Sequence, residues 1–276
     1  MQKQTDSQRY IFQGDAIGAS GQINHPFHDI ISVQAASALT SDGGFSTARV
    51  DGFRYKEIFS FASAYTQITG SEPHTGVFET LSLSVVEKLN ILDVVTCDRV
   101  VARVTAKYPG DRGEGAMPSP ETSIVPRGSY FERLRIGTEF FERLEVAPDC
   151  FCQPEYACWS GLLKALESNE KRTLLQPLSL PVPGPNGKPA PLLYGGKAPS
   201  VLGFGIALRK PKNEGELGEP LCIEVPQFGT VHLGEFFCYP DARQLTMLRV
   251  ELGCPVGGGL SIAIGGGGGT PYPPLR

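Results

Sequence analysis

The sequence predicts an all-β protein, a β-sandwich or barrel with one peripheral helix near residues 159–174. Between Val77 and Ala106, apolar and polar residues alternate with the two-residue period of a half-buried strand. β-branched residues crowd this segment, and they pack better on a pleated sheet than in a helix. The chain also has 33 glycines and 23 prolines but only 20% charged residues, which is typical of strands separated by frequent turns.

The alternation within Val77–Ala106 also predicts which side chains face the core. One face carries the apolar residues and is expected to be buried, and the other carries serines and is expected to face solvent. The period reverses beyond Asp98, which predicts a turn or bulge near residues 97–99. The apolar residues are Leu81, Leu83, Val85, Leu89 and Ile91, and the polar ones include Ser82 and Ser84.

Composition divides the chain into four parts. We expect an N-terminal β-rich region with a short helix over residues 1–176, a Pro-rich connection over 177–199, and strands over 200–264 that complete the same β domain. Residues 265–276 begin with five glycines and continue with prolines, so we expect a disordered tail unless something holds it, such as a neighbouring copy.

Two local patterns predict particular elements. The tetrapeptide FERL occurs at Phe131–Leu134 and again at Phe141–Leu144, and Ile136-Gly137-Thr138 between them can turn the chain. This echo predicts a β-hairpin that presents Leu134 and Leu144 together. The segment Trp159–Leu174 has a narrow leucine stripe opposite charged residues, which predicts an amphipathic helix that ends before a proline.

Charge and hydropathy exclude several classes of partner. A net charge of −4 and a pI near 5.7 give no basic footprint for nucleic acid. No apolar run approaches the roughly 20 residues that span a bilayer. The N-terminus lacks the apolar core of a secretory signal, so the cytoplasm is the default compartment, with the cell surface open through another export route.

Candidate metal ligands and binding aromatics are few. His25, His28 and Asp29 form the densest cluster of possible metal ligands, although a polar loop is the preferred explanation for them. Tyr55 and Tyr65 flank an aromatic segment that could stack on sugar rings, or instead belong to the core. We find no nucleophile motif and no paired acids at a recognisable spacing, so no catalytic residue and no cofactor is expected.

Part of the sequence resembles a known group of proteins. The segment TLSLSVVEKLNILDVVTCDRVVARVTA, together with FGTVHLGEFFCYPDARQLTMLRVELG near the C-terminus, is similar to bacterial all-β proteins of unknown function. Some members of that group are surface proteins of the choice-of-anchor type. The resemblance implies an all-β fold and a surface or structural role, and it transfers no functional residue.

These observations favour a non-enzymatic structural protein that assembles with copies of itself into a filament, shell or surface layer. Assembly would use exposed β-edges and a terminal arm that includes Gly265, Gly269 and Tyr272. A carbohydrate-binding β-module that uses Tyr55 and Tyr65 is one alternative. A metal-dependent hydrolase built on the cluster at residues 25–29 is another.

Overall fold

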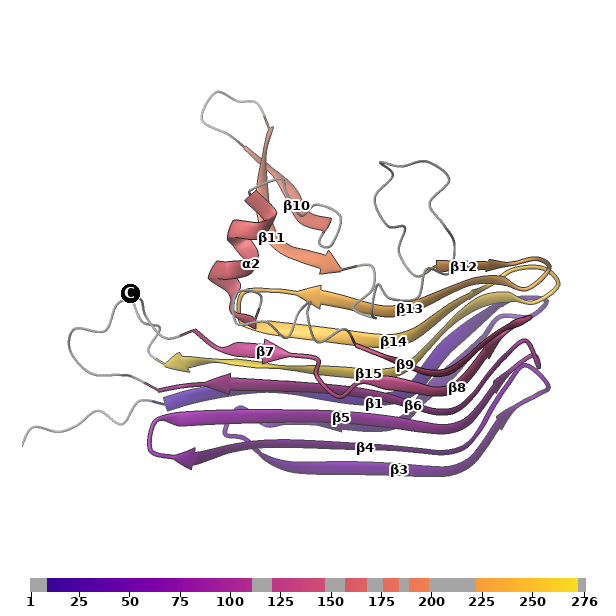
Figure 1. Ribbon diagram of the computed structural model, residues 1–276, viewed down its shortest axis with the longest axis horizontal. Coiled ribbons are helices and arrows are strands. Elements are labelled where there is room, and N and C mark those ends of the chain that lie inside the picture. The colour runs from indigo at the N-terminus through magenta and orange to yellow at the C-terminus, as the bar shows by residue number, and fades with distance from the viewer. Residues whose placement is uncertain are drawn as a thin grey trace, which may run out of the picture.

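The computed structural model describes residues 9–110, 121–146, 157–167, 176–183, 189–198 and 222–272. This part of the chain is an all-β sandwich of two antiparallel sheets, with the short helix α2 (Trp159–Glu167) beside it (Figure 1). The predicted fold class is confirmed, as a sandwich, because the sheets share no strand. The helix begins where it was expected, and its predicted continuation to residue 174 lies outside the described residues.

The larger sheet has eight strands and is built from both ends of the chain. Its main path runs β10-β11-β13-β14-β15-β1-β2, and β12 pairs with β13. The N-terminal and C-terminal segments meet where β15 pairs with β1. The bounds are β1 (Arg9–His25), β2 (Asp29–Ala38), β10 (Gln176–Pro183), β11 (Pro189–Ala198), β12 (Cys222–Val225), β13 (Gly229–Cys238), β14 (Ala242–Leu252) and β15 (Gly257–Tyr272).

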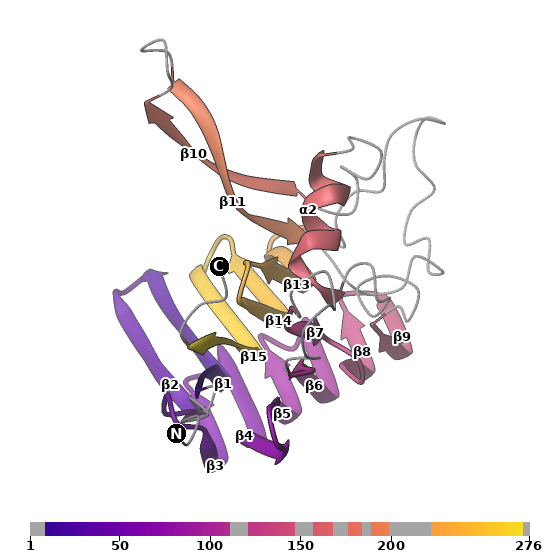
Figure 2. The same ribbon diagram turned by 90° about the vertical axis from the view of Figure 1, so that its left-hand side faces the viewer.

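The smaller sheet has seven strands from the middle of the chain. Its main path runs β3-β4-β5-β6-β8-β9, so consecutive strands are neighbours, and β7 also pairs with β6. Strands β3 and β9 therefore form opposite margins of this sheet (Figure 2). The bounds are β3 (Gly44–Tyr55), β4 (Phe59–His74), β5 (Val77–Ile91), β6 (Val95–Tyr108), β7 (Ser123–Val125), β8 (Tyr130–Ile136) and β9 (Glu139–Glu145).

The glycine-rich C-terminal segment is held by the protein's own sheet as a central strand, so up to residue 272 it is not the disordered tail that was expected in the absence of such contacts. Gly265 lies opposite both Ala16 of β1 and Leu245 of β14, and β15 continues in register to Tyr272 opposite Arg9. Pairing on both sides satisfies the backbone groups of the glycines, which offsets their large conformational entropy. Gly265, Gly269 and Tyr272 therefore belong to the sheet and are not an assembly arm.

The Pro-rich segment also differs from the prediction. Residues 177–199, expected to be a connection, contain most of β10 and β11, which pair as an antiparallel hairpin. Proline lacks the N–H that a central strand needs, and β10 tolerates its prolines because it is an edge strand. β11 reaches β13 only through residues 196–198, beyond its own prolines.

The FERL echo forms the predicted hairpin. Strands β8 and β9 pair antiparallel around the turn at residues 137–138, with Phe131 opposite Leu144 and Leu134 opposite Phe141. Both leucines are buried in the main core. The two tetrapeptides are thus partners in one hairpin, and each places its phenylalanine against the leucine of the other.

Both sheets bend along one line, which we call the crease (Figure 1). In β5, β6, β8 and β9, two consecutive side chains point outward where the strand crosses the crease, so each of these strands reverses which residues it buries. On alternate strands the crossing residue is left-handed, a conformation that costs a residue with a Cβ atom roughly 1–2 kcal/mol. These residues are Gly52, Lys88 and Arg133 in the smaller sheet and Ala35, Gly234 and Ala263 in the larger sheet. The predicted irregularity near residues 97–99 is the place where β6 crosses this line.

The two sides of the crease have different cores. On one side large apolar side chains such as Phe59, Leu134 and Phe236 fill the space between the sheets. On the other side the sheets lie close enough for the buried hydroxyl of Ser82 to donate to the backbone oxygen of Asp15, at 2.7 Å. The serine face of β5 is therefore the buried one, and the predicted assignment of its faces is wrong between residues 80 and 84.

Among the residues that the structure describes, no helix is both long and apolar enough to cross a bilayer.

Candidate functional site: an open sheet edge and an outer groove

Strand β2 ends the larger sheet as an exposed edge. It has ten residues, and none of them is Lys, Arg or Pro, the residues that commonly protect an edge from pairing. Ile30 is 80% exposed and Val33 is 51% exposed, although both are large apolar side chains. The pairing with β1 shifts between Ala19 and Gly21, and this bulge turns Val33 outward. Among the described residues no strand pairs with the free side of β2, where two exposed apolar side chains stand beside the backbone.

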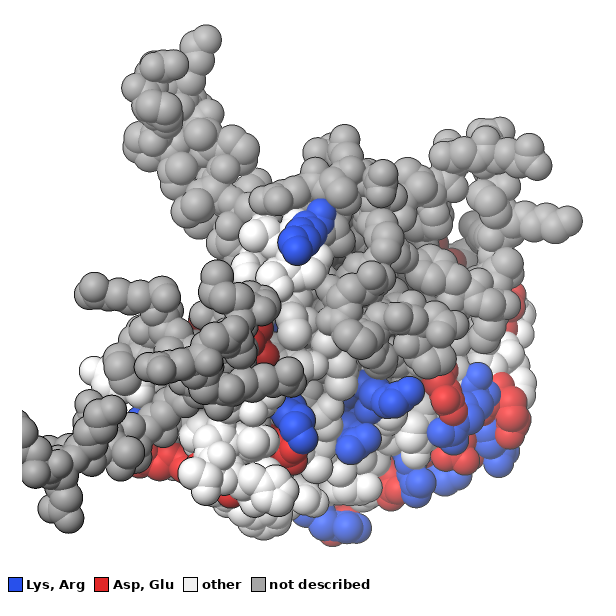
Figure 3. All heavy atoms as spheres, turned by 60° about the vertical axis from the view of Figure 1, so that its left-hand side comes forward, with Lys and Arg blue, Asp and Glu red and all other residues white. Residues whose placement is uncertain are grey.

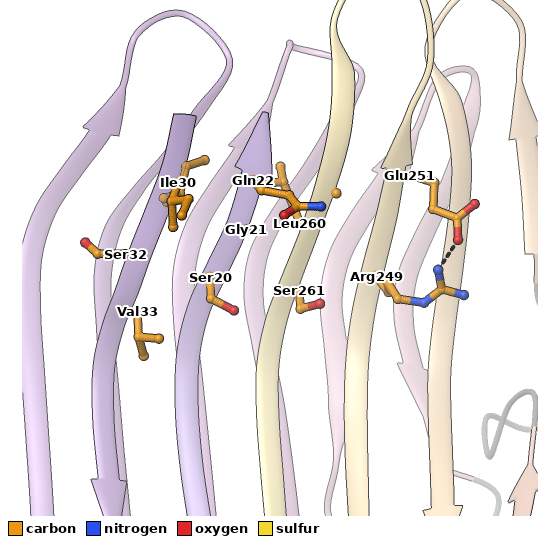
Figure 4. Close-up of a pocket in the computed structure, with 12 residues that line it drawn as sticks. Ser20, Gly21, Gln22, Ile30, Ser32, Val33, Arg249, Glu251, Leu260 and Ser261 are labelled. Atoms are coloured by element: carbon orange, nitrogen blue, oxygen red, sulfur yellow. Dashed lines mark hydrogen bonds and ion pairs between the residues drawn. The ribbon is translucent and has the colours of Figure 1, made fainter. Parts of the chain in front are cut away.

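A shallow groove of about 510 Å³ lies next to this edge, on the outer face of the larger sheet (Figure 4). Ser20 of β1 and Ser261 of β15 face each other on its floor. Ile30 and Val33 border it on the β2 side, and Arg249 borders it on the β14 side. The groove thus combines hydroxyl groups, one apolar wall and one charged wall.

A glycine keeps the floor of the groove open. Gly259 lies between Gln22 and Glu251 in the cross-strand row next to the serines. A Cβ atom added at Gly259 would meet no atom closer than 3.9 Å. A residue with a Cβ atom therefore meets no close contact at that atom, and its side chain would project into the groove.

A buried ion-pair network supports the charged wall. Glu235 of β13 is only 3% exposed. Its carboxylate forms ion pairs with Arg249, at 2.5 Å from Nε, and with Lys197 of β11, at 2.6 Å from Nζ. Burial alone would raise the pKa of Glu235, but the hydrogen bonds from Arg249 and Lys197 outweigh burial and lower this pKa. Arg249 also pairs with Glu251 at the groove. The network fixes Arg249 and ties β11 to the centre of the sheet.

His232 lies beside this network and is held neutral. Its Nε2 atom is 3.6 Å from the nearest carboxylate oxygen of Glu251 and has no hydrogen-bond partner. Burial and the charge of Arg249 both lower the pKa of His232. A neutral imidazole with a free ring nitrogen is a possible metal ligand, but no cluster of three potential ligands occurs in the described part of the chain.

Among the described residues, Arg243 is the largest side chain that is fully buried. It projects between the sheets, and its Nη1 atom donates to the backbone oxygen of Ile124 in β7, at 2.6 Å. Burial lowers the pKa of this guanidinium. The hydrogen bond links β14 of the larger sheet to β7, the short strand that pairs with β6 in the smaller sheet.

The predicted metal residues do not converge on a site. His25 closes β1, His28 lies in the following turn, and Asp29 opens β2. These three side chains form no group of convergent ligands in the described part of the chain, and the Asp29 carboxylate instead accepts a hydrogen bond from the Tyr55 hydroxyl at 2.6 Å. The side chain of Asp29 therefore links the start of β2 to the end of β3.

The predicted sugar platform is also divided. Tyr55 packs against the main hydrophobic core, whereas Tyr65 lies opposite Arg49 and Val85 on the outer side of the smaller sheet. Phe59 and Phe61, between them in sequence, are buried in the core. The two tyrosines do not form one surface.

The comparisons place the chain in a family without assigning it a function. A family model described as a domain of unknown function (DUF8256) matches residues 10–174, which include β1, β2 and the whole smaller sheet. No curated protein and no solved structure matches the chain, and no named relative supports the resemblance to choice-of-anchor-type surface proteins. The family match covers more than half of the sequence, so the protein belongs to the family of the domain of unknown function DUF8256.

Proposed function

We propose that this protein is a non-enzymatic structural protein that assembles with copies of itself through the edges of its sheets. The observation that carries the proposal is the unprotected edge of β2, with Ile30 and Val33 exposed beside it. An edge of this kind readily accepts another strand, because its N–H and C=O groups are already aligned for pairing. A second copy of β2, running antiparallel, would extend the larger sheet and cover Ile30 and Val33 on both partners.

The strand that completes this edge would come from another molecule and not from the C-terminus. Residues 265–272 are already engaged in the centre of the sheet, so they cannot serve as a donated arm without unfolding it. Edge-to-edge pairing leaves the sandwich intact, which makes it the simpler route to a filament, shell or layer.

Light scattering after size exclusion tests the proposal, together with negative-stain images of the same fraction. We expect masses above the 29.7 kDa of one chain that rise with concentration. Replacing Ile30 by Lys should lower them, because a charge at an edge opposes pairing. Tyr272→Lys is a matched control, since Tyr272 is 56% exposed but lies at the end of a central strand. A wild-type protein that stays monomeric at every concentration would overturn the proposal.

The outer groove favours a second candidate, a carbohydrate-binding β-module. Serine hydroxyls, the Gln22 amide and the Arg249–Glu251 pair suit the hydroxyl groups of a sugar, and Ile30 offers an apolar surface to its C–H face. A glycan array with wild-type protein and the Gly259→Tyr variant tests this function, because the tyrosine would fill the groove. Retention that the variant abolishes would support the module, and no retention of any glycan would exclude it.

A further inference from the structure

The crease of the smaller sheet carries a four-residue motif on four neighbouring strands. Each copy reads apolar, acidic, basic, apolar, and its two apolar residues are buried while the charged pair between them points outward. The copies are VEKL at 86–89 in β5, CDRV at 97–100 in β6, FERL at 131–134 in β8 and FERL at 141–144 in β9.

Because the strands are antiparallel, each acidic residue lies opposite a basic one. Glu87, Arg99, Glu132 and Arg143 form one cross-strand row from β5 to β9. The Arg99–Glu87 ion pair in this row measures 2.7 Å. Opposite charges at facing positions stabilise a sheet, and like charges there destabilise it.

The second row has the same alternation with the signs reversed. Asp98 pairs with Lys88 at 3.0 Å and with Arg133 at 3.3 Å. Glu142 continues the row opposite Arg133, because the cross-strand pairs on either side of it are Glu132 with Arg143 and Leu134 with Phe141. On the face shown in Figure 3, acidic and basic side chains are interspersed along the lower right of the molecule.

This pattern stops at β9, which is the margin of the smaller sheet. Glu142 and Arg143 are exposed there, and no strand in the described part of the chain pairs with the outer side of β9. Arg143 already contacts Glu145 on its own strand and the ring of Tyr130, whereas Glu142 has no ion pair with any described residue.

The motif is complementary to itself, and this property identifies a partner. The β8–β9 hairpin shows that FERL pairs antiparallel with FERL, phenylalanine against leucine and glutamate against arginine. The edge of β9 with which no described strand pairs is again FERL, so it matches the β9 edge of a second copy of this chain about a two-fold axis between residues 142 and 143.

We propose that two copies of the protein join β9 to β9 in this register, with Glu142 of each opposite Arg143 of the other. Both charge rows then continue across the contact with alternating sign. The row that ends in Arg143 of one copy meets the row that ends in Glu142 of the other. This contact rests on the proposed function, since it names one partner and one register for edge-to-edge assembly. A seven-residue edge buries little surface, so the contact is weak and depends on concentration.

A charge exchange tests the contact and its register. The Glu142→Arg variant places arginine against arginine twice in its own dimer, and Arg143→Glu places glutamate against glutamate twice. Each should weaken association about tenfold, from two reversed cross-strand pairs. An equimolar mixture of the two variants restores both opposite-charge pairs, so it should regain the wild-type mass in light scattering.

Thermal unfolding of each variant shows that the sandwich is intact, and the recovery in the mixture cannot come from misfolded chains. Glu79→Arg is the matched control, since Glu79 is a partly exposed, ion-paired carboxylate of β5, inside the smaller sheet and on neither of the proposed edges. If wild-type protein associates but neither variant changes its mass, or the mixture does not recover, this contact is wrong while edge assembly stands. If wild-type protein never associates, the proposed function fails as well.

Discussion

Replacing Ser82 by Val tests the side of the crease on which the two sheets lie close together. Ser82 is fully buried, and its hydroxyl donates to the backbone oxygen of Asp15 across the sandwich. Losing this hydrogen bond should cost about 1 kcal/mol. The added methyl groups must also fit near Gly265, whose ideal Cβ position lies 3.2 Å from the serine oxygen, and overpacking of this kind costs about 1–3 kcal/mol. The expected loss in unfolding free energy is therefore about 2–4 kcal/mol.

Equilibrium unfolding in guanidinium chloride measures this loss, with Leu83→Ser as the comparison. Leu83 is adjacent in sequence but half-exposed on the outer face, so its replacement should cost only about 1 kcal/mol or less. Sequence alternation alone would predict the reverse, because it assigns Leu83 to the core. A neutral Ser82→Val variant beside a strongly destabilised Leu83→Ser variant would refute the reasoning.

Three further predictions follow from the same structure. Because the pKa of Glu235 is lowered in the fold, its ion pairs stabilise the protein above the ordinary value of 4.5 and lose that effect as pH falls further. Glu235→Gln should cost about 2 kcal/mol at neutral pH, less than a fully buried pair would, and should flatten the acid limb of stability against pH. Burial raises the pKa of Tyr10 to about 12, so the folded protein should keep the Tyr10 proton up to about that pH. The unfolded chain loses this proton near pH 10, so the protein should lose stability between about pH 10 and 12. Ultraviolet titration of the phenolate checks this prediction. Deleting residues 265–276 should abolish the native circular dichroism spectrum, because it removes half of a central strand, and a folded truncated protein would contradict the pairing of β15.

The sequence alone was enough for the fold class, the β8–β9 hairpin and the start of the helix. Each depends on a local signal: strand periodicity, a repeated tetrapeptide around a turn, or a leucine stripe. The buried face of β5 could not be read in this way, because periodicity shows that two faces differ but not which one meets a glycine-rich strand from the far end of the chain. Ser82 is buried because Gly265, remote in sequence, lets the sheets approach.

The same long-range pairing explains the errors at the C-terminus. Five consecutive glycines are typical of a flexible segment, and only the register with β1 and β14 gives them a fixed place. The open edge of β2 likewise depends on strand order, which the sequence does not reveal. The crease motif was accessible, since VEKL and CDRV share the charge order of the two FERL segments, but its meaning needs the strands side by side.

The two proposed contacts lie on different margins of the sandwich, and this has a consequence for assembly. β9 is the margin of the smaller sheet opposite β3, and β2 packs against β3. A two-fold contact at one margin alone closes a dimer, whereas two different two-fold contacts at opposite margins build an open chain. The β2 contact is apolar and the β9 contact is ionic, so added salt should weaken only the second. Filaments at low salt should therefore give way to dimers at high salt, and the Glu142→Arg variant should need about tenfold more protein than wild type to form filaments at low salt.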